Sequence, residues 1–347
     1  MQKAVFDKFA FLAFYMSLLV VGIHLCVDTF YKFDFNNPAD VVVYNQIYFV
    51  RNVLALIAVP MFFIKSGILF FYNFTPKDYF RKIKRRFSSI FIPFCVWNVL
   101  CYLFDLTVCN FPLTAKFIQN RSVDFGLSEF FCAAFFYTNN PVNWFLFQLM
   151  FFAVISPVFY YLAKNVYVAG AVIFICLCDI ACVNKFFEQF HLLYFSVAFG
   201  VYLFGAVIGM HYKQLLGTVY KTGAVAISWA AFALFLLAIF YVRTHNIAII
   251  PVNFLKMGAI ISLWIGLSRA KISPKWYYGA SFIIYESQVI VASAILKVIL
   301  ILLPNNSFFA ALNFYATIAL SALVSICIYS LAKKYFPKIF ACLNGGR

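Results

Sequence analysis

A histidine near the end of the first long apolar stretch is the residue best suited to proton transfer. His24 lies about 22 Å along a helix that begins at Phe9, within a hydrocarbon core of about 30 Å. An imidazole at that depth can accept the proton of a hydroxyl group that arrives from the nearer membrane face. We expect His24 either to act as such a base or to be an interfacial side chain hydrogen-bonded to a neighbouring helix.

Two residues of opposite charge occur near the middle of neighbouring apolar stretches. Each lies about 14 Å from the start of its stretch, with Lys256 approached from one membrane face and Glu286 from the other. A charge that is alone in hydrocarbon is costly, whereas a pair satisfies both charges. We expect a structural ion pair between Lys256 and Glu286; the alternative is that both residues line a polar cavity.

A short polar break interrupts the apolar sequence PMFFIKSGILFF. Lys65 and Ser66 form the break, and Gly67 follows them. A glycine permits close approach of another backbone or of a ligand. Lys65 either faces a polar site or extends its amine to the inner membrane interface.

The strongest local charge signal is the segment KDYFRKIKRRF, residues 77–87. Such a segment commonly fixes the orientation of a membrane protein and contacts lipid headgroups. Its guanidinium groups are equally suited to bind the phosphates of a cytosolic polyanion. We keep both interpretations for this segment.

The elements that must position these residues are membrane-spanning helices. The sequence is 65% hydrophobic and only 11% charged, less than half of the roughly 25% usual in a soluble domain. Because a span needs about 20 apolar residues, we expect an all-α polytopic membrane helix bundle with about ten spans. They are residues 9–28, 50–72, 88–108, 142–163, 166–183, 191–211, 223–242, 247–268, 277–302 and 308–332. The whole chain, 1–347, reads as one membrane domain.

The basic residues orient these spans. If the N-terminus is cytoplasmic, the predicted inside segments hold about three times as many lysines and arginines as the outside ones, as the positive-inside rule requires. Both termini are then cytoplasmic, and the cytoplasmic (inner) membrane is the expected location. The apolar segment 128–138 is too short to cross, so we expect it to lie at the interface or to re-enter. The polar stretch 111–127 precedes it.

The net charge of +16 is explained by this topology, so we expect membrane lipid and no nucleic acid as a partner. The ten cysteines include no CxxC pair, and no convincing metal-ligand cluster is apparent. We therefore expect no metal and no bound cofactor.

Five stretches together resemble the acyltransferase 3 family of membrane O-acyltransferases. They occur in the family's order and cover nearly the whole chain: GIHL around His24, AVPMFFIKSGILFF, RKIKRRFSSIFIPFCVWN, PVNWFLFQLMFF and ASFIIYESQVIV, followed by the ending GGR. Each match is degenerate alone, but the ordered set is fairly specific.

The resemblance implies transfer of an acyl group, usually acetyl, from cytosolic acyl-CoA to a hydroxyl group of a carbohydrate. By this resemblance His24 is the catalytic residue, and Arg81, Lys82, Arg85 and Arg86 hold the CoA phosphates. The residues expected to orient the thioester or stabilise an oxyanion are Lys65, Ser66, Asn143, Trp144, Gln148, Glu286 and Gln288.

Three positions depart from the family's pattern. Ala13 and Phe147 stand where the family commonly has an arginine, and Gln288 stands where it has a histidine. Glu286, two positions before Gln288, is unusual in this helix. These departures leave a catalytically silent family member as one alternative. A transporter or flippase of a glycan or lipid intermediate is the other, because midplane charge suits either class.

Overall fold

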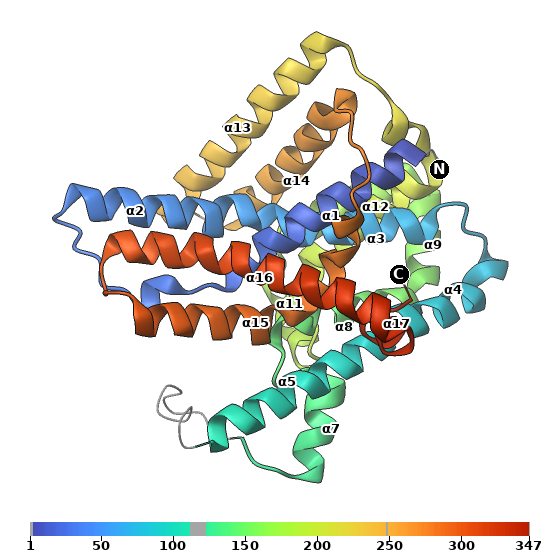
Figure 1. The fold of residues 1–347 in the computed structure, drawn as a ribbon. Helices are drawn as coiled ribbons and strands as arrows, with labels where there is room; N and C mark the ends of the chain where they lie inside the picture. Colours follow the sequence, from blue (N-terminus) through green and yellow to red (C-terminus); the bar gives the residue numbers. More distant parts are fainter. Residues whose placement is uncertain (1–2, 112–122, 248, 347) are drawn as a thin grey trace.

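The computed structural model describes residues 3–111, 123–247 and 249–346, and these residues form α-helices and turns without a strand (Figure 1). Most of the predicted polar stretch 111–127 and the last residue of the ending GGR lie outside the described residues. The α-helices are α1 Lys3–His24, α2 Pro38–Phe49, α3 Ala58–Phe71, α4 Tyr79–Arg86, α5 Ile92–Asn110, α7 Leu127–Phe136, α8 Trp144–Val154, α9 Ser156–Lys164, α10 Val166–Leu177, α11 Ala181–Glu188, α12 Phe195–His211, α13 Thr222–Thr244, α14 Ile249–Gly266, α15 Ser281–Leu302, α16 Ser307–Tyr335 and α17 Pro337–Asn344.

The helices confirm the predicted all-α membrane architecture. Among the described residues, seven helical stretches are long and apolar enough to cross a membrane, and two bent helix pairs raise the number to nine. The predicted span 191–211 corresponds to α12, which is apolar but shorter than these. In lipid, the hydrogen bonds within each helix satisfy the backbone groups of such apolar segments. With seven to nine candidate spans among the described residues, the predicted count of ten is approximate, and the multi-pass membrane character is clear.

Two of the predicted spans are broken helices. The helices α8 and α9 meet at 67°, and α10 and α11 meet at 81°. Pro157 at the start of α9 has no backbone N–H to continue the helix ladder. Asp179, between α10 and α11, has a positive φ of 57°. The predicted short segment 128–138 corresponds to the separate ten-residue helix α7.

Close helix packing in the core depends on Gly67. A Cβ atom at this position would lie 2.5 Å from the backbone oxygen of Tyr202 in α12. Small residues allow such approach between membrane helices. The structure thus confirms that Gly67 admits the close approach of another backbone. This approach lets α3 pack closely against α12.

Two π-helical turns interrupt the helices next to the site described below. Val50–Leu54 links α2 to α3 through a short 3₁₀ turn, and Phe87–Phe91 links α4 to α5. A π-turn redirects side chains and often occurs at functional positions. The first turn carries Arg51, and the second carries Ser89.

The two ends of the described chain meet at one end of the bundle. Phe6, in the first turns of α1, and Gly346, after α17, line the same cavity as residues of α4. The N and C labels in Figure 1 lie on the side of the molecule that carries α4. Which membrane face this end occupies stays a prediction from the distribution of charge.

Candidate functional site

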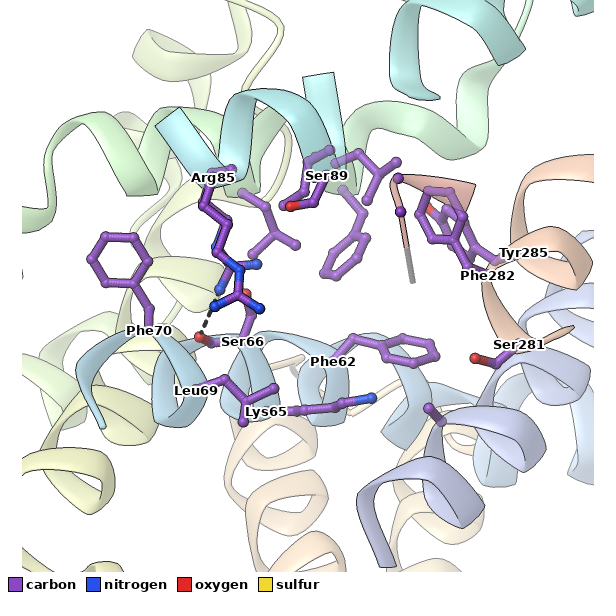
Figure 2. A pocket seen from close by; sticks show the side chains of 18 of the residues that line it. Phe62, Lys65, Ser66, Leu69, Phe70, Arg85, Ser89, Ser281, Phe282 and Tyr285 are labelled. Carbon is purple, nitrogen blue, oxygen red and sulfur yellow. Dashed lines mark hydrogen bonds between the residues drawn. The ribbon is translucent and has the colours of Figure 1, made fainter. Parts of the chain in front are cut away.

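A cavity of about 900 Å³ opens beside α4, a volume typical of small-molecule sites (Figure 2). Its walls come from α1, α3, α4, α8, α15 and the residues after α17. Phe62, Phe70, Phe145 and Phe282 give it an apolar side, whereas basic and hydroxyl side chains occupy the α4 side. The cavity can therefore hold a molecule with one charged end and one less polar end.

The basic residues of α4 divide into two groups. Lys82, Arg85 and Arg86 line the cavity, and Figure 2 shows Arg85 pointing into it. The guanidinium group of Arg86 lies 3.4 Å from the Ser66 backbone oxygen, to which it donates. Arg81 does not line the cavity. The structure therefore does not bring Arg81 together with the other three basic residues in the cavity.

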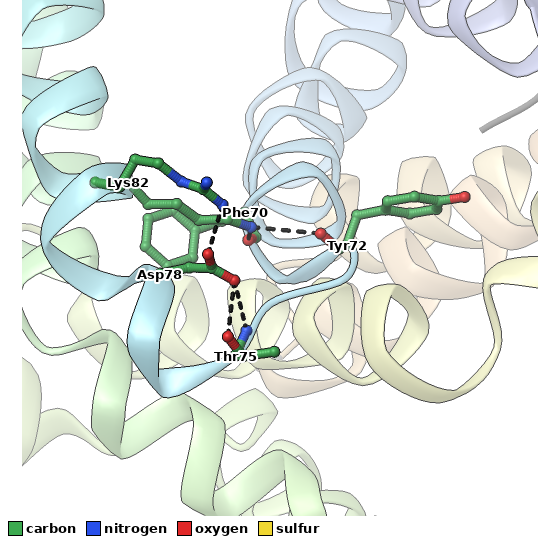
Figure 3. A network of polar contacts seen from close by, with 6 residues as sticks. Phe70, Tyr72, Thr75, Asp78 and Lys82 are labelled. Carbon is green, nitrogen blue, oxygen red and sulfur yellow. Dashed lines mark hydrogen bonds and ion pairs between the residues drawn. The ribbon is translucent and has the colours of Figure 1, made fainter.

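Local hydrogen bonds explain this division (Figure 3). The Asp78 carboxylate accepts from Thr75 and forms an ion pair of 2.5 Å with Arg81, whose side chain is 79% exposed. This pair turns Arg81 away from the cavity. Lys82 donates to the backbone oxygens of Phe70 and Tyr72. These bonds use two of the three N–H groups of Lys82. Arg85 and Arg86 are the better phosphate ligands, because a planar guanidinium can bind two phosphate oxygens at once.

The polar break in α3 faces the same cavity. Lys65 and Ser66 both line it. The amine of Lys65 donates to the backbone oxygen of Phe9 at 3.4 Å, so Lys65 lies between α3 and α1. Of the two interpretations of Lys65, the structure supports a place in a polar site.

The residues after α17 complete the cavity wall. The indole N–H of Trp97 donates to the Leu343 backbone oxygen at 3.0 Å and holds α17 against α5. Gly345 has a φ of 63°, and a Cβ atom there would lie 2.3 Å from the Ser89 backbone oxygen. Both the conformation and the contact require glycine. Gly345 and Gly346 therefore bring the chain against the π-turn that follows α4.

His24 lies at the opposite end of α1 from this cavity. Ala13 is the last cavity residue of α1, and His24 follows about 16 Å further along the helix. The Nδ1 atom of His24 bonds the Val20 backbone oxygen at 2.9 Å, and the side chain remains exposed. This bond leaves Nε2 able to accept a proton.

Helix α15 connects the cavity with His24. Tyr285 lines the cavity, and its hydroxyl donates to the Val142 backbone oxygen. Three residues later, the Gln288 side chain lies near the His24 imidazole. Its amide nitrogen donates to the Tyr285 backbone oxygen at 2.7 Å, and its side-chain oxygen has no hydrogen-bond partner among the described residues. Glu286 lies between them and is fully buried. One turn of α15 thus joins the two parts of the site.

Arg51 is a neighbour of His24 to which the sequence analysis gave no role. Its Nε donates to the Ile23 backbone oxygen at 3.2 Å, and its guanidinium forms an ion pair of 2.6 Å with Asp28. A further contact of 2.9 Å reaches the Cys26 sulfur. Arg51 lies at the start of the expected second span and has the charge to suggest a partner, but the sequence does not say which one.

The residues expected from α8 and the turn before it lie outside the cavity. Asn143 donates to the Asn98 side-chain oxygen at 2.8 Å and joins α8 to α5. Trp144 packs between Phe63 and Tyr194. Gln148 is fully buried, and its amide has no hydrogen-bond partner among the described residues. The structure does not bring these three residues together with the arginines of α4.

The expected ion pair between Lys256 and Glu286 is wrong. The charges that act on Lys256 are those of Asp179 and Arg243. The reason is packing: α14 lies against α13 and contacts α3 and α10, whereas α15 lies against α16 and α1. Helices α14 and α15 follow each other in sequence but pack against different neighbours. Asp179 also accepts a hydrogen bond of 2.6 Å from the Asn184 amide.

Residues 16–331 match the family model described as an acyltransferase domain, the model of the acyltransferase 3 family. Comparison with curated proteins and with solved structures gave no match. The family match covers the residues of the site described above except Phe6, Phe9, Ala13, Leu343, Gly345 and Gly346.

Proposed function

Because the chain belongs to the acyltransferase 3 family, we propose that this membrane acyltransferase moves an acyl group, most simply acetyl, from acyl-CoA to a hydroxyl group of a surface carbohydrate. The observation that carries the proposal is the single turn of α15 between the cavity and His24. Tyr285 belongs to the cavity, and Gln288 lies near the imidazole, on a helix that packs against α1. A donor in the cavity and an acceptor at His24 would meet at this turn.

The donor would enter from the α4 side, which we assign to the cytoplasm. Arg85 and Arg86 would bind its phosphates, because planar guanidinium groups bind phosphate oxygens in pairs. The apolar wall at Phe62 and Phe282 would take the less polar arm. Lys65 and Ser66 also line the cavity and would lie along this arm. No bound cofactor is required, because acyl-CoA is a substrate in this scheme.

The chemistry would take place near His24. Nε2 would accept the proton of the acceptor hydroxyl, whose oxygen attacks the thioester carbonyl carbon. The C–O bond forms, the C–S bond breaks, and the departing sulfur takes the proton from the imidazolium. Glu286 and Gln288 are buried polar side chains on the turn of α15 that lies near this step. The buried amide of Gln148 has unused hydrogen-bonding capacity, but it does not line the cavity.

Transfer of labelled acetyl from acetyl-CoA to surface carbohydrate tests the proposal. Membranes with wild-type protein should label the carbohydrate, and membranes with His24→Ala at equal protein level should not. Failure of the wild type with surface carbohydrate from the producing cells would contradict the proposal. Carbohydrate that crosses the membrane without becoming acylated would identify a flippase instead.

A further inference from the structure

Aromatic side chains lie at the His24 end of the 900 Å³ cavity. On α15, Tyr285 is the cavity residue nearest to Gln288, which lies near the imidazole. On α3, Phe62 is the cavity residue nearest to the helix start, which follows the π-turn that carries Arg51. Figure 2 shows the Phe62 ring extending from α3 toward the α15 side of the cavity. Both rings therefore lie where the cavity ends toward His24.

A third ring comes from α8. Phe145 is the first residue of this helix that lines the cavity. The other end of α8 contacts α4, where the Tyr79 hydroxyl donates to the Val154 backbone oxygen at 2.8 Å. Phe145 is therefore the cavity residue of α8 that lies farthest from the arginines of α4.

The three rings contact one another in pairs. The centroid of Phe62 lies 5.9 Å from that of Phe145 and 6.4 Å from that of Tyr285. The centroids of Phe145 and Tyr285 are 5.9 Å apart. Both pairs that include Tyr285 meet edge to face, an arrangement that aromatic rings prefer. One ring from each of three helices thus lies across the end of the cavity.

Two of the rings are fixed by further contacts. The Tyr285 hydroxyl donates to the Val142 backbone oxygen, and Phe145 also packs against Phe63 at 4.7 Å. Both side chains are buried. Phe62 is half-buried, and among the described residues its ring contacts are those with Phe145 and Tyr285. Phe62 is therefore the ring that can move aside most easily.

The position of the rings restricts what can pass from the cavity to His24. A donor whose phosphates bind Arg85 and Arg86 has to bring its thioester past them. An acetyl group extends only one methyl group beyond the thioester carbonyl. Each further methylene group needs space that the contacting rings occupy, and a close-packed interior offers little other room.

We propose that Phe62, Phe145 and Tyr285 form a constriction that limits the length of the transferred acyl group, with Phe62 as its specificity-determining residue. A short acyl group passes the constriction, whereas a hexanoyl chain meets the ring of Phe62. The inference rests on the proposed function, because that function brings the donor from the cavity to His24.

Acyl-CoA donors of increasing chain length test the constriction. Acetyl-CoA, butyryl-CoA and hexanoyl-CoA are supplied to membranes that contain the full chain, and kcat/KM for transfer to surface carbohydrate is measured for each donor. Equilibrium binding of the same donors to the purified protein gives a second readout that does not require transfer. The variants are Phe62→Leu and Phe62→Ala. Leu69→Ala is the matched control, because Leu69 lines the cavity on the same helix about two turns nearer to α4.

The wild type should use and bind hexanoyl-CoA about tenfold less well than acetyl-CoA, or worse. Phe62→Ala should increase transfer from hexanoyl-CoA and remove most of the difference between the donors, and Phe62→Leu should be intermediate. Such a gain of activity cannot result from misfolding. Leu69→Ala should keep the wild-type ratio of hexanoyl to acetyl transfer.

Equal kcat/KM for hexanoyl-CoA and acetyl-CoA in the wild type would overturn the constriction and leave the proposed function intact. An unchanged ratio in Phe62→Ala, or the same gain in Leu69→Ala, would also overturn it. Selective binding of acetyl-CoA that Phe62→Ala removes, in a protein that transfers no acyl group, would support the constriction and contradict the proposed function. A protein that binds none of the three donors would overturn both.

Discussion

The Nδ1 atom of His24 lies 2.9 Å from the backbone oxygen of Val20, one turn earlier in α1. A carbonyl oxygen only accepts hydrogen bonds, so Nδ1 carries the proton of the neutral ring and Nε2 carries the lone pair. The helix itself therefore selects the tautomer that a general base needs.

Replacement of His24 by alanine should remove this base. We expect acyl transfer to fall by about 10²–10⁴-fold, while donor binding stays unchanged because the cavity lies at the other end of α1. Labelled acetyl incorporation measures the first quantity, and equilibrium binding of acetyl-CoA the second. His245→Ala is the control, since that residue is exposed after α13 and bonds only its own turn among the described residues. Equal transfer in both variants would exclude His24 from the mechanism.

The two arginines in the cavity should matter more for donor binding than the one outside it. Arg85→Gln with Arg86→Gln should weaken acetyl-CoA binding, and the wild-type affinity should fall as salt rises. Arg81→Gln is the matched control, because Arg81 pairs with Asp78 and is largely exposed. Isothermal titration over a salt series measures both effects. If Arg81→Gln weakened binding as strongly as the double replacement, the division of α4 would be wrong.

Gly67→Ala should destabilise the bundle by roughly 1–3 kcal/mol, as overpacking does, because the added Cβ would meet the backbone of Tyr202. Gly170 in α10 has no atom within 4 Å of such a Cβ. Gly170→Ala should therefore leave thermal stability in detergent unchanged or slightly higher. Equal melting temperatures for the two variants would show that α3 and α12 are less closely packed than described.

Lys256 and Asp179 should be coupled in stability. A double-mutant cycle with Lys256→Met and Asp179→Asn should give an interaction of ~0.5–3 kcal/mol, because Asp179 is the acid that acts on Lys256. The same cycle with Lys256→Met and Glu286→Gln should be additive within ~0.5 kcal/mol. Coupling of Lys256 with Glu286, together with additivity of Lys256 and Asp179, would support the ion pair predicted from the sequence.

The predicted membrane orientation is tested by reporter fusions. A fusion after Lys82 should report the cytoplasm, and a fusion near Asn305, between α15 and α16, should report the opposite side. A cytoplasmic signal near Asn305 would contradict the assignment of the last two spans.

The sequence predicted the features that depend on local composition. Long apolar stretches gave the helices, and Gly67 within an apolar helix predicted close packing. Both follow from rules that act over a few neighbouring residues. The short helix α7 was recognised for the same reason, since its apolar stretch is too short to cross.

The features that depend on helix arrangement were not predictable. Lys256 and Glu286 have matching depths, but depth does not determine which helices touch. Arg81 belongs to the same basic run as Arg85. Only the ion pair between Arg81 and Asp78 shows that Arg81 lies outside the cavity that Arg85 lines. Arg51 acts across the gap between α1 and the π-turn, a contact that no spacing in the sequence reveals.

The wall formed by Gly345 and Gly346 has a consequence for the biogenesis of the protein. Phe6, on the same cavity, precedes Gly345 by more than 300 residues in the sequence, so Gly345 is synthesised long after it. Synthesis proceeds from the N-terminus, so a nascent chain already holding His24, Arg85 and Tyr285 in the bilayer still has a cavity open on one side. Only the docking of α17 through Trp97 closes it. The cavity is thus completed only after α17 has been made, and a chain truncated before α17 would enter the membrane with this wall missing.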